Sequence, residues 1–279
     1  MRLRVHTDAD DFLASAGDWY RRSPIVHTIE LSLLRRALPG PEDPLLLTVW
    51  EGDELVGAAM RTPPLALLCG GLTGAPLDET VRAVHGAGLA VPGVRGPRAT
   101  TERFCRRWCA HTGSVAEGTV EERLYRLGTL TGPAGVAGVH RVARPADLPV
   151  LIRYQCDFAA EALGHEPDPH RAAAAVAAAG AVGDAYLLWT AHGAPVSMAA
   201  VRAPAAGVSR IGPVYTPPEV RGRGFGSAVT AAACRWALTA GARHVVLFAD
   251  VANPASNHVY RKLGFVPVGD SLIVDLRVP

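Results

Sequence analysis

Arg221-Gly222-Arg223-Gly224-Phe225-Gly226-Ser227 is the stretch that decides how this chain of 279 residues folds. It follows an apolar run at 211–216 that predicts a strand, and it precedes an alanine-rich segment at 228–239 that predicts a helix. Glycines let a backbone approach a ligand closely and adopt positive φ angles. The first N–H groups of a helix lack partners within the helix, and the helix dipole adds positive charge there. With two arginines, this segment predicts an anion site suited to phosphate.

The glycine spacing alone leaves the kind of site open. A dinucleotide-binding fingerprint needs Gly-x-Gly-x-x-Gly, whereas these glycines occupy the alternate positions 222, 224 and 226. A P-loop needs Gly-Lys followed by Ser or Thr, and that tripeptide does not follow Gly226. A tight strand-to-helix turn that binds nothing would also use glycine.

Residues downstream of this loop give the chain a family resemblance. An apolar stretch at 244–248 predicts a buried strand, and Asn253, Tyr260 and Gly264-Phe265 follow it. The order of strand, loop, helix, strand, helix and tyrosine resembles the GNAT superfamily of acyl-CoA-dependent N-acyltransferases. The run Pro-x-x-Arg-Gly-x-Gly-x-Gly at 218–226 is similar to the family's loop, and the resemblance covers residues 138–279. It implies acetyl-CoA as the cofactor and an amine as the acceptor.

The resemblance also implies where coenzyme A binds. In the family, two central strands separate and the pantetheine arm pairs with exposed backbone. Here that strand covers 209–216, and Pro213, which has no N–H, supports an interrupted ladder, although an ordinary bulge is the alternative. Asn253 matches an asparagine that binds the pantetheine arm, and Asn-Pro is also a good helix start. The remaining implied contacts are backbone groups of Val214, Tyr215 and Thr216 for the pantetheine and the thioester carbonyl, and Arg221, Gly222, Arg223, Gly224, Phe225, Gly226 and Ser227 for the pyrophosphate, with Phe225 packing beneath the loop.

The catalytic residues are predicted less directly. Tyr260 matches the family's candidate general acid, a phenol that could protonate or hydrogen-bond the leaving thiolate; a buried structural tyrosine is the alternative. No glutamate occurs in the segment 208–215, where some members of the family carry a base. Asp250, after the strand at 244–248, and Glu161, on a helix expected at 153–163, are the candidate bases, and a chain of waters is an equal alternative.

Composition excludes several classes of function. The formal net charge is +2 and no basic run stands out, so nucleic acid is not expected as a partner. No apolar run approaches the ~20 residues of a membrane-spanning helix, and the N-terminus has no apolar signal region, so we expect a cytoplasmic protein. We expect an acyl-CoA and an amine as partners. A homodimer is one possible assembly, and the sequence leaves it open.

Cysteines and histidines predict neither disulfides nor a metal. The number of cysteines, five, is odd, which argues against a disulfide framework, and Cys105 and Cys109 are expected to be core or partly buried thiols. The segment 165–170 contains two histidines, Glu166 and Asp168, but its two prolines predict an irregular loop rather than a metal site.

A faint internal repeat predicts two related halves. Arg4-Val5 followed by Ala9-Asp10 recurs 137 residues later as Arg141-Val142 followed by Ala146-Asp147. Each half also predicts a hairpin, at 45–61 and at 186–202, and a Gly/Thr/Pro/Ala stretch at 128–138 predicts the boundary. We therefore expect an α/β chain with a mixed sheet: two GNAT-like domains in tandem, at 1–130 and 138–279, each with a mostly antiparallel sheet flanked by helices.

The halves then diverge, which bears on function. The first half has no arginine-glycine loop and no match to Asn253, Tyr260 and Gly264-Phe265, so it is interpreted as a degenerate copy. The leading interpretation is an N-acetyltransferase that uses acetyl-CoA. A catalytically silent acyl-CoA sensor is one alternative, and a purely structural two-domain protein is another.

Overall fold

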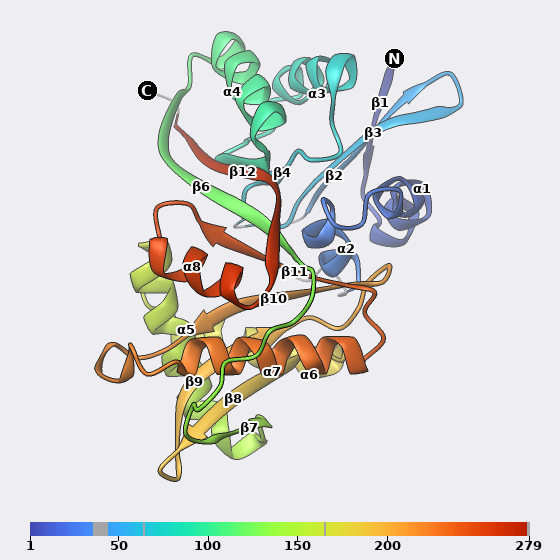
Figure 1. Cartoon of the computed structure of the whole chain (residues 1–279). Helices are drawn as coiled ribbons and strands as arrows, with labels where there is room; N and C mark the ends of the chain where they lie inside the picture. The colour runs from blue at the N-terminus through green and yellow to red at the C-terminus, as the bar shows by residue number, and fades with distance from the viewer. Residues whose placement is uncertain (36–43, 64, 165, 278–279) are drawn as a thin grey trace. The chain divides into compact units, whose positions relative to one another are not determined.

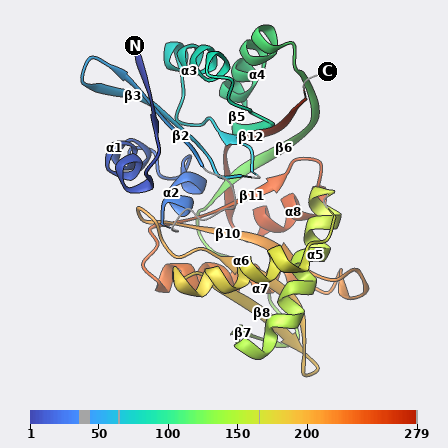
Figure 2. The ribbon, with the colours of Figure 1, turned by 180° about the vertical axis from the view of Figure 1, so that it is seen from behind.

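The computed structural model describes residues 1–35, 44–63, 65–164 and 166–277, and these residues divide into two compact units (Figures 1 and 2). The N-terminal unit comprises Met1–Leu124, Ala249–Ala252 and Val268–Pro279, and the C-terminal unit comprises Tyr125–Phe248 and Asn253–Pro267. Strands β6, β11 and β12 therefore contribute residues to both units.

The N-terminal unit begins with a strand, two helices and three more strands. Its elements are β1 (Arg2–His6), α1 (Ala9–Arg21), α2 (Thr28–Leu34), β2 (Leu45–Glu51), β3 (Glu54–Arg61), β4 (Leu67–Leu68), α3 (Gly74–Gly86), β5 (Gly93–Pro97), α4 (Arg98–Thr112) and β6 (Val115–Leu127).

The second half of the chain repeats this order of strands and α-helices, with short 3₁₀ turns at Pro145–Asp147 and Pro218–Val220. Its elements are β7 (Val139–Val142), α5 (Leu148–Leu163), α6 (Pro169–Ala181), β8 (Ala185–Ala191), β9 (Ala194–Val201), β10 (Val208–Tyr215), α7 (Phe225–Thr239), β11 (His244–Asp250), α8 (Pro254–Lys262) and β12 (Phe265–Arg277).

Strand pairing is mixed and mostly antiparallel in both units. In the N-terminal unit, β1, β2, β3 and β4 pair antiparallel in that order, β4 pairs parallel with β5, and β5 pairs antiparallel with β12. In the C-terminal unit, β7, β8, β9 and β10 pair antiparallel and β10 pairs parallel with β11. The predicted fold class, two GNAT-like folds in tandem, is confirmed.

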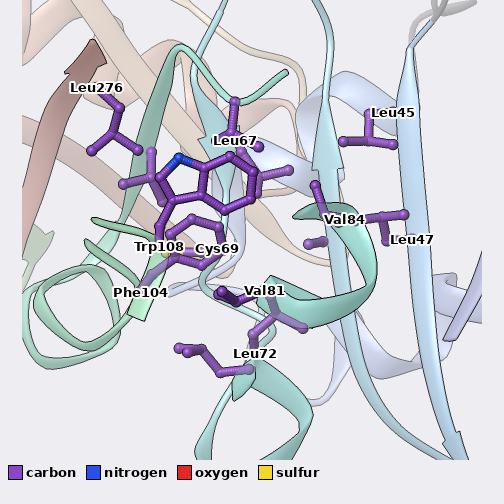
Figure 3. Packing of buried hydrophobic residues seen from close by; sticks show 14 of the residues in the cluster. Leu45, Leu47, Leu67, Cys69, Leu72, Val81, Val84, Phe104, Trp108 and Leu276 are labelled. Atoms are coloured by element: carbon purple, nitrogen blue, oxygen red, sulfur yellow. The ribbon is translucent and has the colours of Figure 1, made fainter. Parts of the chain in front are cut away.

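Each unit has its own hydrophobic core. In the N-terminal unit, alternate residues of β2, Leu45, Leu47 and Val49, face one side of the sheet. They pack with Val81 of α3 and with Phe104 and Trp108 of α4, whose rings stack with centroids 5.9 Å apart (Figure 3). In the C-terminal unit, α7 covers one face of the sheet and α5 and α6 lie on the other (Figures 1 and 2).

Three local predictions need correction. Helix α7 begins at Phe225 rather than at residue 228, because Gly224 adopts a left-handed conformation and is itself the N-cap. Strand β11 continues to Asp250, which therefore ends the strand instead of following it. Pro169 starts α6, with the Asp168 carboxylate accepting a hydrogen bond from the Arg171 N–H at 2.9 Å, so His170 is helical.

Other absences can be stated only for part of the chain. His165 lies outside the described residues, and no cluster suited to a metal occurs among those that are described. All five cysteines are free thiols, as expected. None of the described helices is long and apolar enough to span a bilayer.

Candidate active site

The centre of the C-terminal unit is the place where β10 stops pairing with β11. Parallel pairing runs from Val208 and His244 to Ile211 and Leu247. Beyond Ile211, β10 stays paired with β9, after a register shift that precedes Val214. The predicted interruption is therefore present, and the residues from Gly212 to Tyr215 have their β11 side outside that parallel ladder.

Side chains of β9 and the loop bind the carbonyls at the end of this strand. Ser197 Oγ donates to the Tyr215 carbonyl at 2.9 Å and lies 2.8 Å from Thr216 Oγ1. Arg221 Nε donates to the Thr216 carbonyl at 2.8 Å. Since a carbonyl oxygen has two lone pairs, and no second bond to the Thr216 carbonyl occurs among the described residues, this carbonyl keeps one acceptor position for a ligand.

The glycine loop has the backbone geometry that an anion site requires. Gly222 and Gly224 adopt φ angles of +77° and +80°, and a Cβ at Gly222 would meet no atom within 4 Å. Gly224 caps α7 without a side-chain hydrogen bond, and the first N–H bonded back to the cap is that of Ala228. The N–H groups of Phe225, Gly226 and Ser227 are thus the unpaired donors of the first turn.

Phe225 and Arg223 pack together in the glycine loop. Phe225 is buried, as predicted, and the guanidinium carbon of Arg223 lies 5.1 Å from the centre of its ring. Among the described residues, Arg223 forms no ion pair. Its charge is therefore available at the mouth of the loop.

Glu161 links helix α5 to the strand and the loop. Tyr215 Oη donates to Glu161 Oε1 at 2.8 Å, and Arg221 Nη2 donates to Glu161 Oε2 at 2.5 Å. Arg221, and then the Tyr215 hydroxyl, hold the pKa of Glu161 below its usual value, while burial and this carboxylate raise the pKa of Tyr215. Each oxygen of Glu161 already accepts a hydrogen bond, and the carboxylate is therefore poorly suited to act as a general base.

Helix α8 carries the predicted asparagine and tyrosine. Asn253 Oδ1 accepts from the Ser256 N–H at 3.0 Å, which confirms its predicted capping role. Sequence reasoning missed Asn257, a buried side chain that accepts from Tyr125 Oη at 2.8 Å and donates to the Asn253 carbonyl at 2.7 Å. These two hydrogen bonds of Asn257 fix the first turn of α8.

Tyr260 is held between two rings. Its ring centre lies 6.0 Å from that of Phe265 and 6.5 Å from that of Tyr125. Burial, with a smaller effect of Cys234, raises the pKa of Tyr260 to about 12. No hydrogen bond to its hydroxyl occurs within the described part of the chain. The group is therefore a neutral phenol with its proton uncommitted.

Asp250 belongs to the N-terminal unit by its contacts. Its Oδ1 accepts from the Ala252 N–H at 2.7 Å, so the carboxylate stabilises the turn that follows β11. The structure thus brings Tyr215, Arg221 and Glu161 into direct contact, whereas Asp250 forms its hydrogen bond within the turn.

Comparisons with known proteins bear on the family and on the fold. Residues 151–265 match the model of the Acetyltransferase (GNAT) family. None of the curated proteins matches the chain. Among solved structures, the chain is similar to a protein from Drosophila, with a TM-score of 0.68 and 13% identity over 99% of this chain and 98% of that one.

Two further structures are similar over nearly their whole lengths. An acetyltransferase of the GNAT family from Colwellia psychrerythraea has a TM-score of 0.65 and 12% identity, with 99% of both chains covered. A tandem GNAT protein from the clavulanic acid biosynthesis pathway has a TM-score of 0.59 and 12% identity, covering 99% of this chain and 98% of that one. At such identities, the likeness concerns the fold.

Proposed function

Since residues 151–265 match the model of the Acetyltransferase (GNAT) family and the fold of the chain is similar to that of a tandem GNAT protein, we propose that it transfers an acetyl group from acetyl-CoA to a primary amine. The separation of β10 from β11 beside the glycine loop is the observation that carries this proposal. It leaves backbone groups next to an anion site, as a ligand with both an amide arm and a pyrophosphate requires.

The residues present fit coenzyme A. Gly222 has open space where a side chain would otherwise stand, and the first turn of α7 supplies N–H donors. Arg223 adds a charge that no described carboxylate neutralises. We assign the pyrophosphate to the segment 221–227, the pantetheine amides to the backbone of 214–216, and a further contact to Asn253. When bound, acetyl-CoA would supply an acyl group activated as a thioester.

Tyr260 is proposed to hold the proton for the leaving group. With a pKa of about 12, its hydroxyl stays protonated at neutral pH and can donate. Its oxygen makes no hydrogen bond within the described residues and is not one of their buried unpartnered atoms, so a ligand can reach it, which supports this role.

Glu161 is proposed as a positioning residue rather than as the base. Its carboxylate joins Tyr215 at the end of β10 to Arg221 at the start of the loop. We propose that the amine loses its proton to water or to Asp250. An Asp250→Asn variant distinguishes these routes, because only the second predicts that turnover falls while acetyl-CoA affinity is retained.

The N-terminal half of the chain is proposed to be the degenerate copy, with the domains at 1–130 and 138–279. It follows the same order of elements, and its described residues contain no arginine-glycine loop. We propose that it has lost the ability to bind coenzyme A.

The test is a panel of amines with acetyl-CoA and detection of the free thiol. Amine-dependent thiol release is expected for the wild type and its loss is expected when the loop is altered. A silent acyl-CoA sensor is the second candidate, favoured by the engagement of both Glu161 oxygens. Tight binding of coenzyme A without thiol release for any amine would establish the sensor and overturn the enzyme.

A further inference from the structure

A second group of polar side chains lies buried in the N-terminal unit, where β4 leaves β5. Tyr20 of α1 is 0% exposed, His27 precedes α2 with 7% exposed, and Glu30 of α2 has 4% exposed. The rings of Tyr20 and His27 meet edge to face with centroids 5.1 Å apart. Tyrosine, histidine and glutamate have polar atoms that are costly to bury without partners.

Two of these polar atoms have no partner. Tyr20 Oη and His27 Nδ1 are buried and make no hydrogen bond within the described residues. Glu30 Oε1 lies 3.5 Å from His27 Nδ1, which is an ion-pair distance without hydrogen-bond geometry. Burying a polar group without a partner is unfavourable, so two such atoms in the group that contains Glu30 indicate a polar occupant.

Gly70 lies against this group without a side chain of its own. A Cβ on Gly70 would lie 3.2 Å from Glu30 Oε1 and 3.5 Å from His27 Nδ1. Gly70 follows directly after Cys69, whose N–H makes the last bond of β4 to the Arg95 carbonyl at 2.9 Å. In the C-terminal unit, Gly212 likewise follows the last residue of β10 that pairs with β11.

The charge of Glu30 bears on which occupant fits. In the part of the chain that the structure describes, Glu30 has no arginine or lysine partner, and His27 at 3.5 Å balances its charge only when the imidazole is protonated. A buried carboxylate needs a cation or several hydrogen bonds. A water molecule would supply hydrogen bonds but no charge.

We propose that the N-terminal unit binds a small ammonium-type cation, the head group of a primary amine, between Tyr20, His27 and Glu30. An ammonium group has three N–H donors, and the site has three acceptors: the Glu30 carboxylate, Tyr20 Oη and, in the tautomer protonated on Nε2, His27 Nδ1. This amine site lies outside the segments assigned to acetyl transfer.

The test measures thermal unfolding of the full-length protein without acetyl-CoA, at increasing methylammonium chloride. Sodium chloride and tetramethylammonium chloride at matched ionic strength are the controls, since tetramethylammonium has no N–H. A saturable rise in the unfolding temperature is expected with methylammonium alone. Equal responses to methylammonium and tetramethylammonium, or no response to either, would overturn the proposal and leave water as the occupant.

Variants locate the response. Glu30→Gln should abolish it, whereas Glu54→Gln, which changes an exposed carboxylate on β3, should keep it. Tyr20→Phe preserves the ring and should raise the half-saturating concentration about tenfold or more, because a hydrogen bond to a charged group is lost. If Glu30→Gln does not fold, Tyr20→Phe decides alone. Tyr260→Phe must keep the response, and its loss there would move the site to the C-terminal unit and refute the proposal.

Discussion

The two units end the same parallel strand pair in different ways. In the N-terminal unit, five residues, 69–73, connect β4 to α3, and buried side chains from α1 and α2 gather around Gly70. In the C-terminal unit, nine residues, 216–224, connect β10 to α7 and form the arginine-glycine loop. The comparison teaches that one shared framework can carry connections of different length and sequence at the same point.

Exchanging these connections should have the largest effect. Replacing 216–224 by the sequence of 69–73 is expected to abolish the thermal stabilisation by coenzyme A, because the unpaired N–H groups and both arginines are displaced. The measurement is the unfolding temperature with and without coenzyme A. Arg223→Glu is the milder companion, since it reverses one charge and leaves the backbone intact. Undiminished stabilisation in both variants would show that the loop is not the pyrophosphate site.

Tyr260→Phe should have the next largest effect. Loss of the proton donor is expected to lower kcat on the order of 100-fold and to leave the affinity for coenzyme A within about twofold. Steady-state kinetics with an amine found in the panel measures both quantities. Tyr125→Phe is the matched control, since its hydroxyl serves Asn257 and its loss should lower stability more than kcat. Similar kcat values for Tyr260→Phe and the wild type would return Tyr260 to a structural role.

Glu161→Gln should have a moderate effect that separates positioning from base catalysis. The amide cannot hold Arg221 as an ion pair, so we expect the KM for acetyl-CoA to change several-fold and kcat to change less. The dependence of kcat on pH should keep its shape. A base would behave differently: kcat would collapse and the acidic limb of the pH profile would disappear.

The smallest expected effect compares the arginines of the sequence repeat. Arg141 binds both oxygens of Asp147 at 2.6 and 2.8 Å, whereas Arg4 makes one exposed contact with Asp11 at 2.8 Å. Arg141→Ala should lower the free energy of unfolding by about 1–2 kcal/mol, and Arg4→Ala by about 0.5 kcal/mol or less. Urea unfolding at neutral pH measures both losses.

This ion pair also predicts a pH dependence. Hydrogen bonding to Arg141, aided by the Arg144 N–H, lowers the pKa of Asp147 to about 2 from a usual 3.8. The stability that it contributes is therefore complete above pH 3.8 and is lost as the pH falls through about 2. In the Arg141→Ala variant, the free energy of unfolding, measured by urea unfolding at several pH values, should fall less steeply between pH 3.8 and about 2. An unchanged slope would mean that other carboxylates control unfolding in acid.

Local patterns predicted much of the fold and part of the site. Apolar runs joined by short turns predicted the hairpins β2–β3 and β8–β9, and Asn253-Pro254 marked the start of α8, because these features depend on neighbours in sequence. The start of α7 was misplaced, since the left-handed conformation of Gly224 is a property of the folded loop.

Contacts between distant residues could not be predicted in the same way. The bond from Arg221 to Glu161 spans 60 residues, and that from Tyr125 to Asn257 spans 132. Neither pair has a pattern that distinguishes it from other charged or polar residues on helices. Glu161 was thus proposed as a base from its residue type, and only its two partners indicated a positioning role.

Strand β12 has a consequence for anyone who would cut this protein in two. It starts in the C-terminal unit at Phe265, and its later residues, such as Ser271 and Asp275, pair with β5 of the N-terminal unit. A fragment that stops at residue 130 would lack this strand and leave the edge of β5 bare, an invitation to aggregate. Cutting the chain within 128–138 would therefore leave the N-terminal fragment without residues 268–279, which belong to its unit. Any transfer of the N-terminal unit into another protein must include this final strand.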